Sequence, residues 1–158
     1  MTLSLLTLLV LLTLVAVRTV QGVRALRARG RAIRPTLPPA ALFAESGASG
    51  HSEANFITRM GGARRVLLVS VTERELVIDC VFPFNVFMYE NPYDIEHRVP
   101  IRQVEGVELV DRNSVRVRFV DREQRAHTLR LYLKQPDYFV SSLASLGVPG
   151  ALAPSNRS

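Results

Sequence analysis

The chain opens with an apolar run and then changes to short stretches in which apolar and polar residues alternate. Residues 1–17 read MTLSLLTLLVLLTLVAV, with threonine and one serine as the polar residues. A helix of this length spans about 26 Å, slightly less than a hydrocarbon core of about 30 Å. Thr19 and Val20 add to the span if the side chain of Arg18 extends to the membrane interface. The pattern therefore predicts a transmembrane anchor over residues 1–20.

The basic residues that follow this run predict its orientation. They are all arginines: Arg18, Arg24, Arg27, Arg29, Arg31 and Arg34. By the positive-inside rule, the N-terminus faces out and the C-terminal domain is cytoplasmic, at the inner (plasma) membrane of the cell. A cleaved signal peptide would instead carry its positive charges before the apolar run. A helix buried against a partner is the remaining alternative.

We interpret residues 21–34 as an Arg-rich juxtamembrane segment, in which the helix continues and then breaks near Gly30. Its arginines either only set the topology or also attract anionic lipid headgroups, at about 1 kcal/mol each. The chain's other 14 basic residues balance its 14 acidic residues, so the net charge of +6 belongs to Arg18–Arg34. This distribution indicates a membrane surface as the partner and argues against nucleic acid.

Residues 35–54 are expected to form a flexible linker, because Pro35–Gly50 holds three prolines and small residues without periodicity. Residues 55–147 then show the alternation of antiparallel strands between turn residues. The expected strands are Phe56–Thr58, Arg65–Val71, Glu75–Val81, His97–Ile101, Glu105–Val110, Ser114–Val120 and Ala126–Leu133. The sequence thus predicts a mainly β domain.

The domain is expected to end in one amphipathic helix. Pro136 suits its first turn, and Phe139, Leu143 and Leu146 fall on one face. Gly147 ends the helix, and residues 148–158 are expected to form a disordered tail.

This order of elements resembles the pleckstrin-homology (PH) superfold, and in particular the bacterial PH-like membrane proteins, in which such a domain follows one or more transmembrane helices. The likeness is carried by Leu76–Ile78, Val99–Ile101 with Val104–Glu105, Val115–Phe119, Leu129–Leu133, and Phe139 with Leu143. It implies a β-barrel or β-sandwich with a C-terminal helix. It does not extend to phosphoinositide binding, because the first hairpin turn, Thr72–Glu75, lacks a basic motif. The tryptophan typical of the C-terminal helix in eukaryotic PH domains is also missing.

Two surfaces are candidates for contacts. The first is a group of four cations that strand alternation places outward: Arg116, Arg118, Arg130 and Lys134. Like charges that face each other across a sheet destabilise it, so this group would favour an anionic partner. A solvated face that Glu108 partly neutralises is the alternative. The second candidate is an aromatic segment that contains Phe82, Phe84, Phe87, Met88 and Tyr89. It either covers an open end of the barrel or contacts a partner.

The sequence carries no catalytic motif, and we expect neither an enzyme nor a bound cofactor or metal. Asp94, Glu96 and His97 form its tightest acid–histidine cluster, but His127 and the third histidine lie far away in the sequence, so a solvated loop is expected. Cys80 is interpreted as a packed small residue.

Two classes of function fit these features. The first is a non-enzymatic, membrane-tethered PH-like module that contacts a protein or the inner leaflet. The second is a small accessory or regulatory subunit of a membrane protein complex. In that case the apolar helix would bind other helices, with Thr7 and Thr13 as its polar residues in mid-span.

Overall fold

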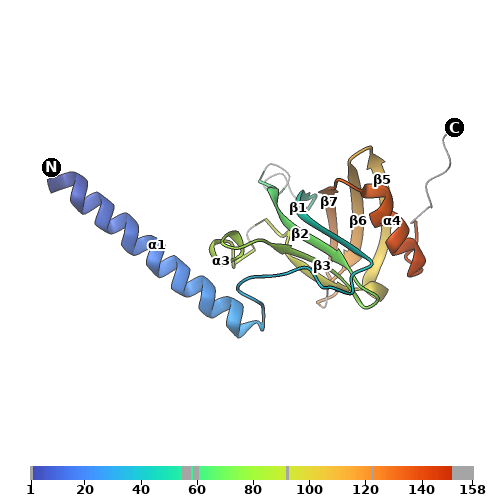
Figure 1. Ribbon diagram of the computed structural model, residues 1–158, viewed down its shortest axis with the longest axis horizontal. Coiled ribbons are helices and arrows are strands. Elements are labelled where there is room, and N and C mark those ends of the chain that lie inside the picture. Colours follow the sequence, from blue (N-terminus) through green and yellow to red (C-terminus); the bar gives the residue numbers. More distant parts are fainter. Residues whose placement is uncertain (1, 55–57, 59–60, 92, 122, 151–158) are drawn as a thin grey trace. The chain divides into compact units, whose positions relative to one another are not determined.

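The computed structural model describes residues 2–54, 58, 61–91, 93–121 and 123–150 (Figure 1). The chain divides into two compact units. The first combines Met1–Pro35 with Val81–Glu90, and the second combines Thr36–Cys80 with Asn91–Ser158.

The first unit is built on the long helix α1, Thr2–Ala28. Its apolar side chains are largely exposed, from 46% at Val15 to 74% at Leu5. Among the described residues, α1 is the one helix that is long and apolar enough to cross a membrane. An N-terminal signal sequence has the same two properties. The hydroxyl of Thr13 donates to the carbonyl oxygen of Leu9 at 2.8 Å, so this polar group is satisfied within the helix.

Helix α1 ends where the sequence predicts a break. Gly30 adopts a φ of +64°, a left-handed conformation that glycine tolerates without strain. A second, short helix, α3 at Phe84–Phe87, packs against α1. The backbones approach so closely at Gly22 that a Cβ there would lie 2.0 Å from the carbonyl oxygen of Val86. Glycine at this position is therefore a requirement of the packing.

The second unit contains a seven-stranded antiparallel sheet in the order β4-β3-β2-β1-β7-β6-β5 (Figure 1). The strands are β1 Phe43–Ser52, β2 Ala63–Val71, β3 Glu75–Cys80, β4 His97–Pro100, β5 Val104–Asp111, β6 Ser114–Val120 and β7 Ala126–Tyr132. A 3-10 turn, Ile101–Gln103, joins β4 to β5. The predicted antiparallel β structure from residue 65 onward is confirmed.

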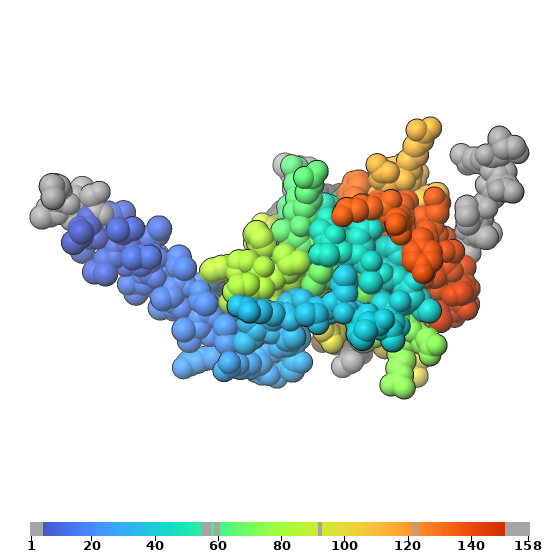
Figure 2. Space-filling view, viewed as in Figure 1, coloured from blue at the N-terminus to red at the C-terminus, as the bar shows by residue number. Residues whose placement is uncertain are grey.

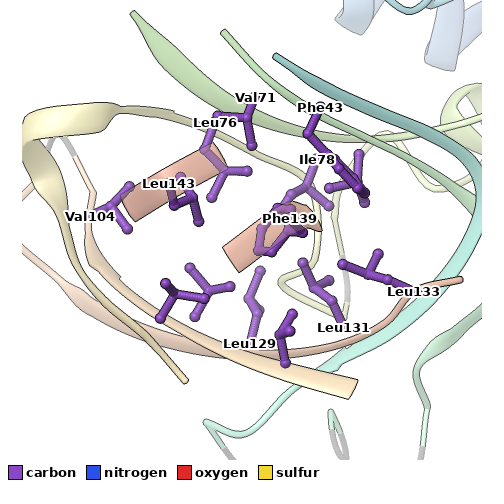
Figure 3. Packing of buried hydrophobic residues seen from close by; sticks show 14 of the residues in the cluster. Phe43, Val71, Leu76, Ile78, Val104, Leu129, Leu131, Leu133, Phe139 and Leu143 are labelled. Atoms are coloured by element: carbon purple, nitrogen blue, oxygen red, sulfur yellow. The ribbon is translucent and has the colours of Figure 1, made fainter. Parts of the chain in front are cut away.

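Helix α4, Pro136–Ser145, completes the core of this unit. Phe139 and Leu143 are fully buried and lie between the strands that carry Leu76 and Ile78 and those that carry Leu129 (Figure 3). The opposite face of α4 is open to solvent beside the strand β1 (Figure 2). The predicted amphipathic helix is thus confirmed, and its apolar face fills the space that the curved sheet leaves.

The predicted linker over residues 35–54 is wrong in its second half, because residues 43–52 form the central strand β1, between β2 and β7. Small residues are a poor strand signal, but here they allow close packing. A Cβ at Gly50 would lie 2.8 Å from Leu131 Cδ2 and 3.0 Å from the carbonyl oxygen of Arg130. The contacts of both neighbouring strands therefore override the weak local preference.

Two further predictions concern the ends of the domain. The strand predicted at residues 56–58 lies mostly outside the described residues. The tail predicted from residue 148 is wrong at its first residues, because Val148 is buried in the core and the carbonyl oxygen of Pro149 accepts a hydrogen bond from Val107 N–H at 3.3 Å. Residues 151–158 lie outside the described residues.

Candidate functional site

Two histidines meet inside the second unit. His97 begins the edge strand β4, and His127 lies on β7, on the inward side that also carries Leu129 and Leu131. Their ring centroids are 4.7 Å apart. The ring of His127 stacks on Phe119 at 5.2 Å and 13°, and His97 meets the same phenyl ring edge-on at 4.9 Å. The sheet therefore curves until its edge strand β4 comes into contact with β6 and β7.

Asp94 holds the two histidines together. Its carboxylate lies 2.8 Å from His127 Nδ1 and 3.3 Å from His97 Nε2, and its own carbonyl oxygen lies 3.0 Å from His97 Nε2. Asp94 adopts a φ of +51°, in a loop shaped by Asn91, whose Oδ1 accepts hydrogen bonds from Ile95 N–H and the next backbone N–H. Hydrogen bonding to His97, and secondarily to His127, lowers the pKa of Asp94 to about 2 against the opposing effect of partial burial.

Asp121 lies on the other side of His127. Its Oδ2 is 3.0 Å from His127 Nε2 and 2.9 Å from Arg125 Nε, and its Oδ1 accepts from the backbone N–H of Arg125 at 2.9 Å. Desolvation would raise the pKa of Asp121, but the hydrogen bonds from the Arg125 backbone, His127 and the Arg125 guanidinium outweigh it and lower the pKa. Asp121 is therefore a fixed anion that faces the second nitrogen of His127.

This geometry can bind a cation. One donor atom each from Asp94, His97 and His127 lie within 4.8 Å of one another. Two imidazoles and a carboxylate form a donor set that suits zinc and neighbouring divalent metals. We define Asp94, His97 and His127 as the histidine cluster.

Sequence reasoning identified this site only in part. It grouped Asp94 and His97 with Glu96, but Glu96 is buried elsewhere and accepts a hydrogen bond from Cys80 N–H at 3.2 Å. The expected solvated loop is therefore wrong, and His127 was missed. Strand alternation could have indicated that His127 points inward, because it places residue 127 on the same face as Leu129. Cys80 itself is buried in the core.

The cations on the sheet surface are largely neutralised within the domain. Arg116 lies opposite Arg130, as predicted, but Arg116 pairs with Glu53 and with Glu108, each at 3.1 Å. Arg130 pairs with Asp111 at 2.7 Å. Of the two alternatives for this surface, these contacts favour the partly neutralised face at these two arginines, with Glu53 as an additional acid from the segment that was expected to be linker. Arg118 and Lys134 are exposed.

The aromatic segment belongs to the first unit, where it meets the juxtamembrane arginines. Arg18 pairs with Glu90 at 3.1 Å and lies 4.9 Å from the centroid of Tyr89, whose carbonyl oxygen accepts from Arg29 at 2.6 Å. Arg34 lies 5.3 Å from the centroid of the Phe82 ring. The sequence treated these as two separate features, whereas the structure brings them into one surface.

Within this segment, Val86 is buried, and Asn85 is buried with its amide donating to the carbonyl oxygen of Ile33 at 2.8 Å. Phe82 and Phe84 remain exposed at 46% and 43%, while Phe87, Met88 and Tyr89 are half-buried. Comparison of the chain with known protein families, with curated proteins and with solved structures gives no match.

Proposed function

We propose that the chain is a non-enzymatic, membrane-tethered module, with α1 as an uncleaved anchor and the β domain in the cytoplasm. The observation that carries this proposal is the exposure of the apolar side chains of α1, such as Leu5 at 74% and Leu14 at 62%. Exposed apolar surface costs about 25 cal/mol per Å² in water, and a bilayer removes that cost. The arginines at the C-terminal end of α1 favour the cytoplasmic side for that end.

The β domain is proposed to be PH-like. The strand order, with β1 between β2 and β7, supports this assignment, as does the C-terminal helix α4 packed against the core. The phosphoinositide role of many PH domains is not proposed, because the β2–β3 turn is Thr72–Glu75 and the arginines at 116 and 130 are paired with carboxylates of the domain.

The contact with the inner leaflet is proposed to lie at the end of α1. Arg24 and Arg27 are exposed there, in the last turns of the helix. Each arginine near an anionic membrane surface contributes about 1 kcal/mol, and physiological salt screens much of it. This segment therefore contacts lipid headgroups more strongly than the sheet does.

The anchor and its orientation are tested with reporters fused after Ser158. A reporter that is active only in the cytosol is expected to work in this position. The full-length chain should also stay in the membrane fraction and keep its N-terminal residues after carbonate extraction. Activity of a periplasmic reporter, or loss of residues 1–20 by cleavage, would contradict the proposal.

The lipid contact is tested on the full chain purified in mild detergent, by mass spectrometry of the lipids that remain bound. Arg24→Gln with Arg27→Gln should reduce the retained anionic lipid. The matched control is Arg64→Gln with Arg65→Gln, because it removes the same charge from exposed positions on β2. Equal retention in both double variants would show that the α1 arginines make no specific lipid contact.

One observation favours a second candidate, an accessory subunit of a membrane complex. Phe82 and Phe84 are exposed although they lie just before the packed residue Val86 in the sequence. Exposed aromatic side chains next to a membrane helix suit a protein partner. Affinity purification from detergent extracts decides this point: a stoichiometric partner that Phe82→Ser with Phe84→Ser removes would support the second candidate.

A further inference from the structure

We propose that Asp94, His97 and His127 bind a divalent transition-metal ion of the zinc type, and that Asp121 is the positioning residue for His127. The donor atoms of the three ligands already lie within 4.8 Å of one another. They come from the edge strand β4, from β7 and from the loop before β4. A bound ion would therefore link the edge of the sheet to its interior.

The donor set selects the class of ion. Imidazole nitrogen suits zinc, copper, iron, cobalt and nickel, whereas calcium and magnesium prefer oxygen donors throughout. Two histidines and one carboxylate match the three-ligand sites of zinc, in which water completes the coordination. Asp94 has a third of its side chain exposed, which leaves room for that water.

The hydrogen bonds of His127 are the second argument. Both of its ring nitrogens face carboxylate oxygens, at 2.8 Å from Asp94 and 3.0 Å from Asp121. A divalent cation between Asp94 and His127 would bind Nδ1, while Nε2–H donates to the carboxylate of Asp121. This carboxylate–histidine–metal arrangement is how metal-binding histidines are usually oriented.

A tetrahedral site requires the donor atoms to move closer together. Metal–donor bonds of about 2.0–2.2 Å place two donor atoms about 3.3–3.6 Å apart in that geometry. Donor atoms that lie up to 4.8 Å apart must therefore approach by as much as about 1.5 Å. Asp94 can supply that movement because it lies in a loop, whereas His127 is held by its stacking on Phe119.

The test uses the full chain in detergent micelles, purified without a polyhistidine tag and stripped with a chelator. Zinc binding is measured by isothermal titration calorimetry and by equilibrium dialysis against a competing chelator. We expect one zinc ion per chain. The decisive variant is Asp94→Asn, because asparagine keeps the shape of the side chain and tolerates the φ of +51°. It should weaken zinc binding by about 100-fold or more, because loss of a direct ligand should cost at least as much as loss of a second-sphere contact.

His97→Ala and His127→Ala should have the same effect, and circular dichroism shows whether each variant still folds. The matched control is His51→Ala, because it removes the chain's third histidine from outside the cluster. Asp121→Asn should weaken binding by about 10- to 100-fold but retain one ion per chain, since it changes the orientation of His127 and removes no ligand.

A second readout does not depend on the histidine variants. Zinc should raise the midpoint of thermal unfolding of the wild-type chain and of His51→Ala, but not that of Asp94→Asn. The proposal is overturned if the folded wild-type chain binds no zinc. It is equally overturned if Asp94→Asn binds zinc as tightly as the wild type, or if His51→Ala abolishes binding.

Discussion

Glu45 accepts hydrogen bonds from the backbone N–H of Lys134 through both carboxylate oxygens, each at 3.0 Å, across 89 positions of the sequence. Glu45 lies on β1 and is 8% exposed, and Lys134 follows β7. A residue expected to lie in a flexible linker thus satisfies a backbone group at the far end of the domain. Residues 43–52 are therefore part of the folded domain.

The first prediction concerns where this domain begins. A fragment of residues 36–150 should fold cooperatively with a β-rich circular-dichroism spectrum. A fragment of residues 53–150 should remain unfolded, because it lacks β1 and leaves β2 and β7 without their shared neighbour. The longer fragment also exposes Val86, which packs against α1 in the full chain. Val86→Ser should therefore reduce its self-association in sedimentation analysis. Cooperative folding of the shorter fragment would contradict this boundary.

The second prediction tests the buried carboxylate directly. Glu45→Ala leaves the N–H of Lys134 without this acceptor and should lower the free energy of unfolding by about 1–3 kcal/mol. Glu45→Gln keeps one carbonyl oxygen and should cost less. Urea denaturation of the 36–150 fragment measures both changes, with the exposed Glu105→Ala as control. Equal stability of the alanine variants at the two positions would show that the contact contributes nothing.

The third prediction concerns the sheet surface. The 36–150 fragment should bind anionic vesicles weakly, because Arg116 and Arg130 are neutralised by Glu53, Glu108 and Asp111. Replacing these three acids by their amides should create salt-sensitive binding, measured by co-sedimentation.

The matched control for the vesicle experiment neutralises three exposed acids elsewhere: Glu73→Gln, Glu105→Gln and Asp137→Asn. It adds the same net charge without freeing the sheet arginines, so it should bind less than the first triple variant. Tight binding by the unmodified fragment that Arg116→Glu with Arg130→Glu abolishes would show that the sheet is a ligand site in its own right.

The fourth prediction tests the contact between α1 and α3. Gly22→Ala raises helix propensity by about 1 kcal/mol, yet its methyl group would collide with the carbonyl oxygen of Val86. Hydrogen exchange of residues 84–88 in the full chain should therefore become faster. Gln21→Ala, at an exposed position of the same helix, should leave the exchange rate unchanged. Unchanged exchange in both variants would contradict the close approach.

Features that depend on neighbouring residues in the sequence were predicted, whereas features that depend on distant strands were not. Alternation in β6 predicted the inward positions of Val115 and Phe119, both fully buried, because a regular two-residue period is a local property. The register that places Glu108 opposite Arg116 follows from the short turn between β5 and β6. The strand β1 could not be predicted in this way, because the reason for its small residues lies in its neighbours.

The histidine cluster was missed for a related reason. His97 and Asp94 are close in sequence, but His127 reaches them only because the sheet curves until β4 meets β7. Alternation gives the side of the sheet on which a residue lies, but not which inward residues meet across the interior. That information requires the curvature of the whole sheet.

The position of β1 between β2 and β7 has a consequence for biosynthesis. Its pairing with β2 can form early, but its other edge stays open until β7 has been synthesised. The core is complete only when α4 follows, as in the hydrogen bond from the Ser142 hydroxyl to the carbonyl oxygen of Leu42, at 3.4 Å across 100 positions. Such long-range closure makes folding slow and exposes strand edges on the nascent chain. A chain that terminates before residue 126 is thus expected to aggregate or be degraded, because β1 then keeps one edge without a neighbouring strand.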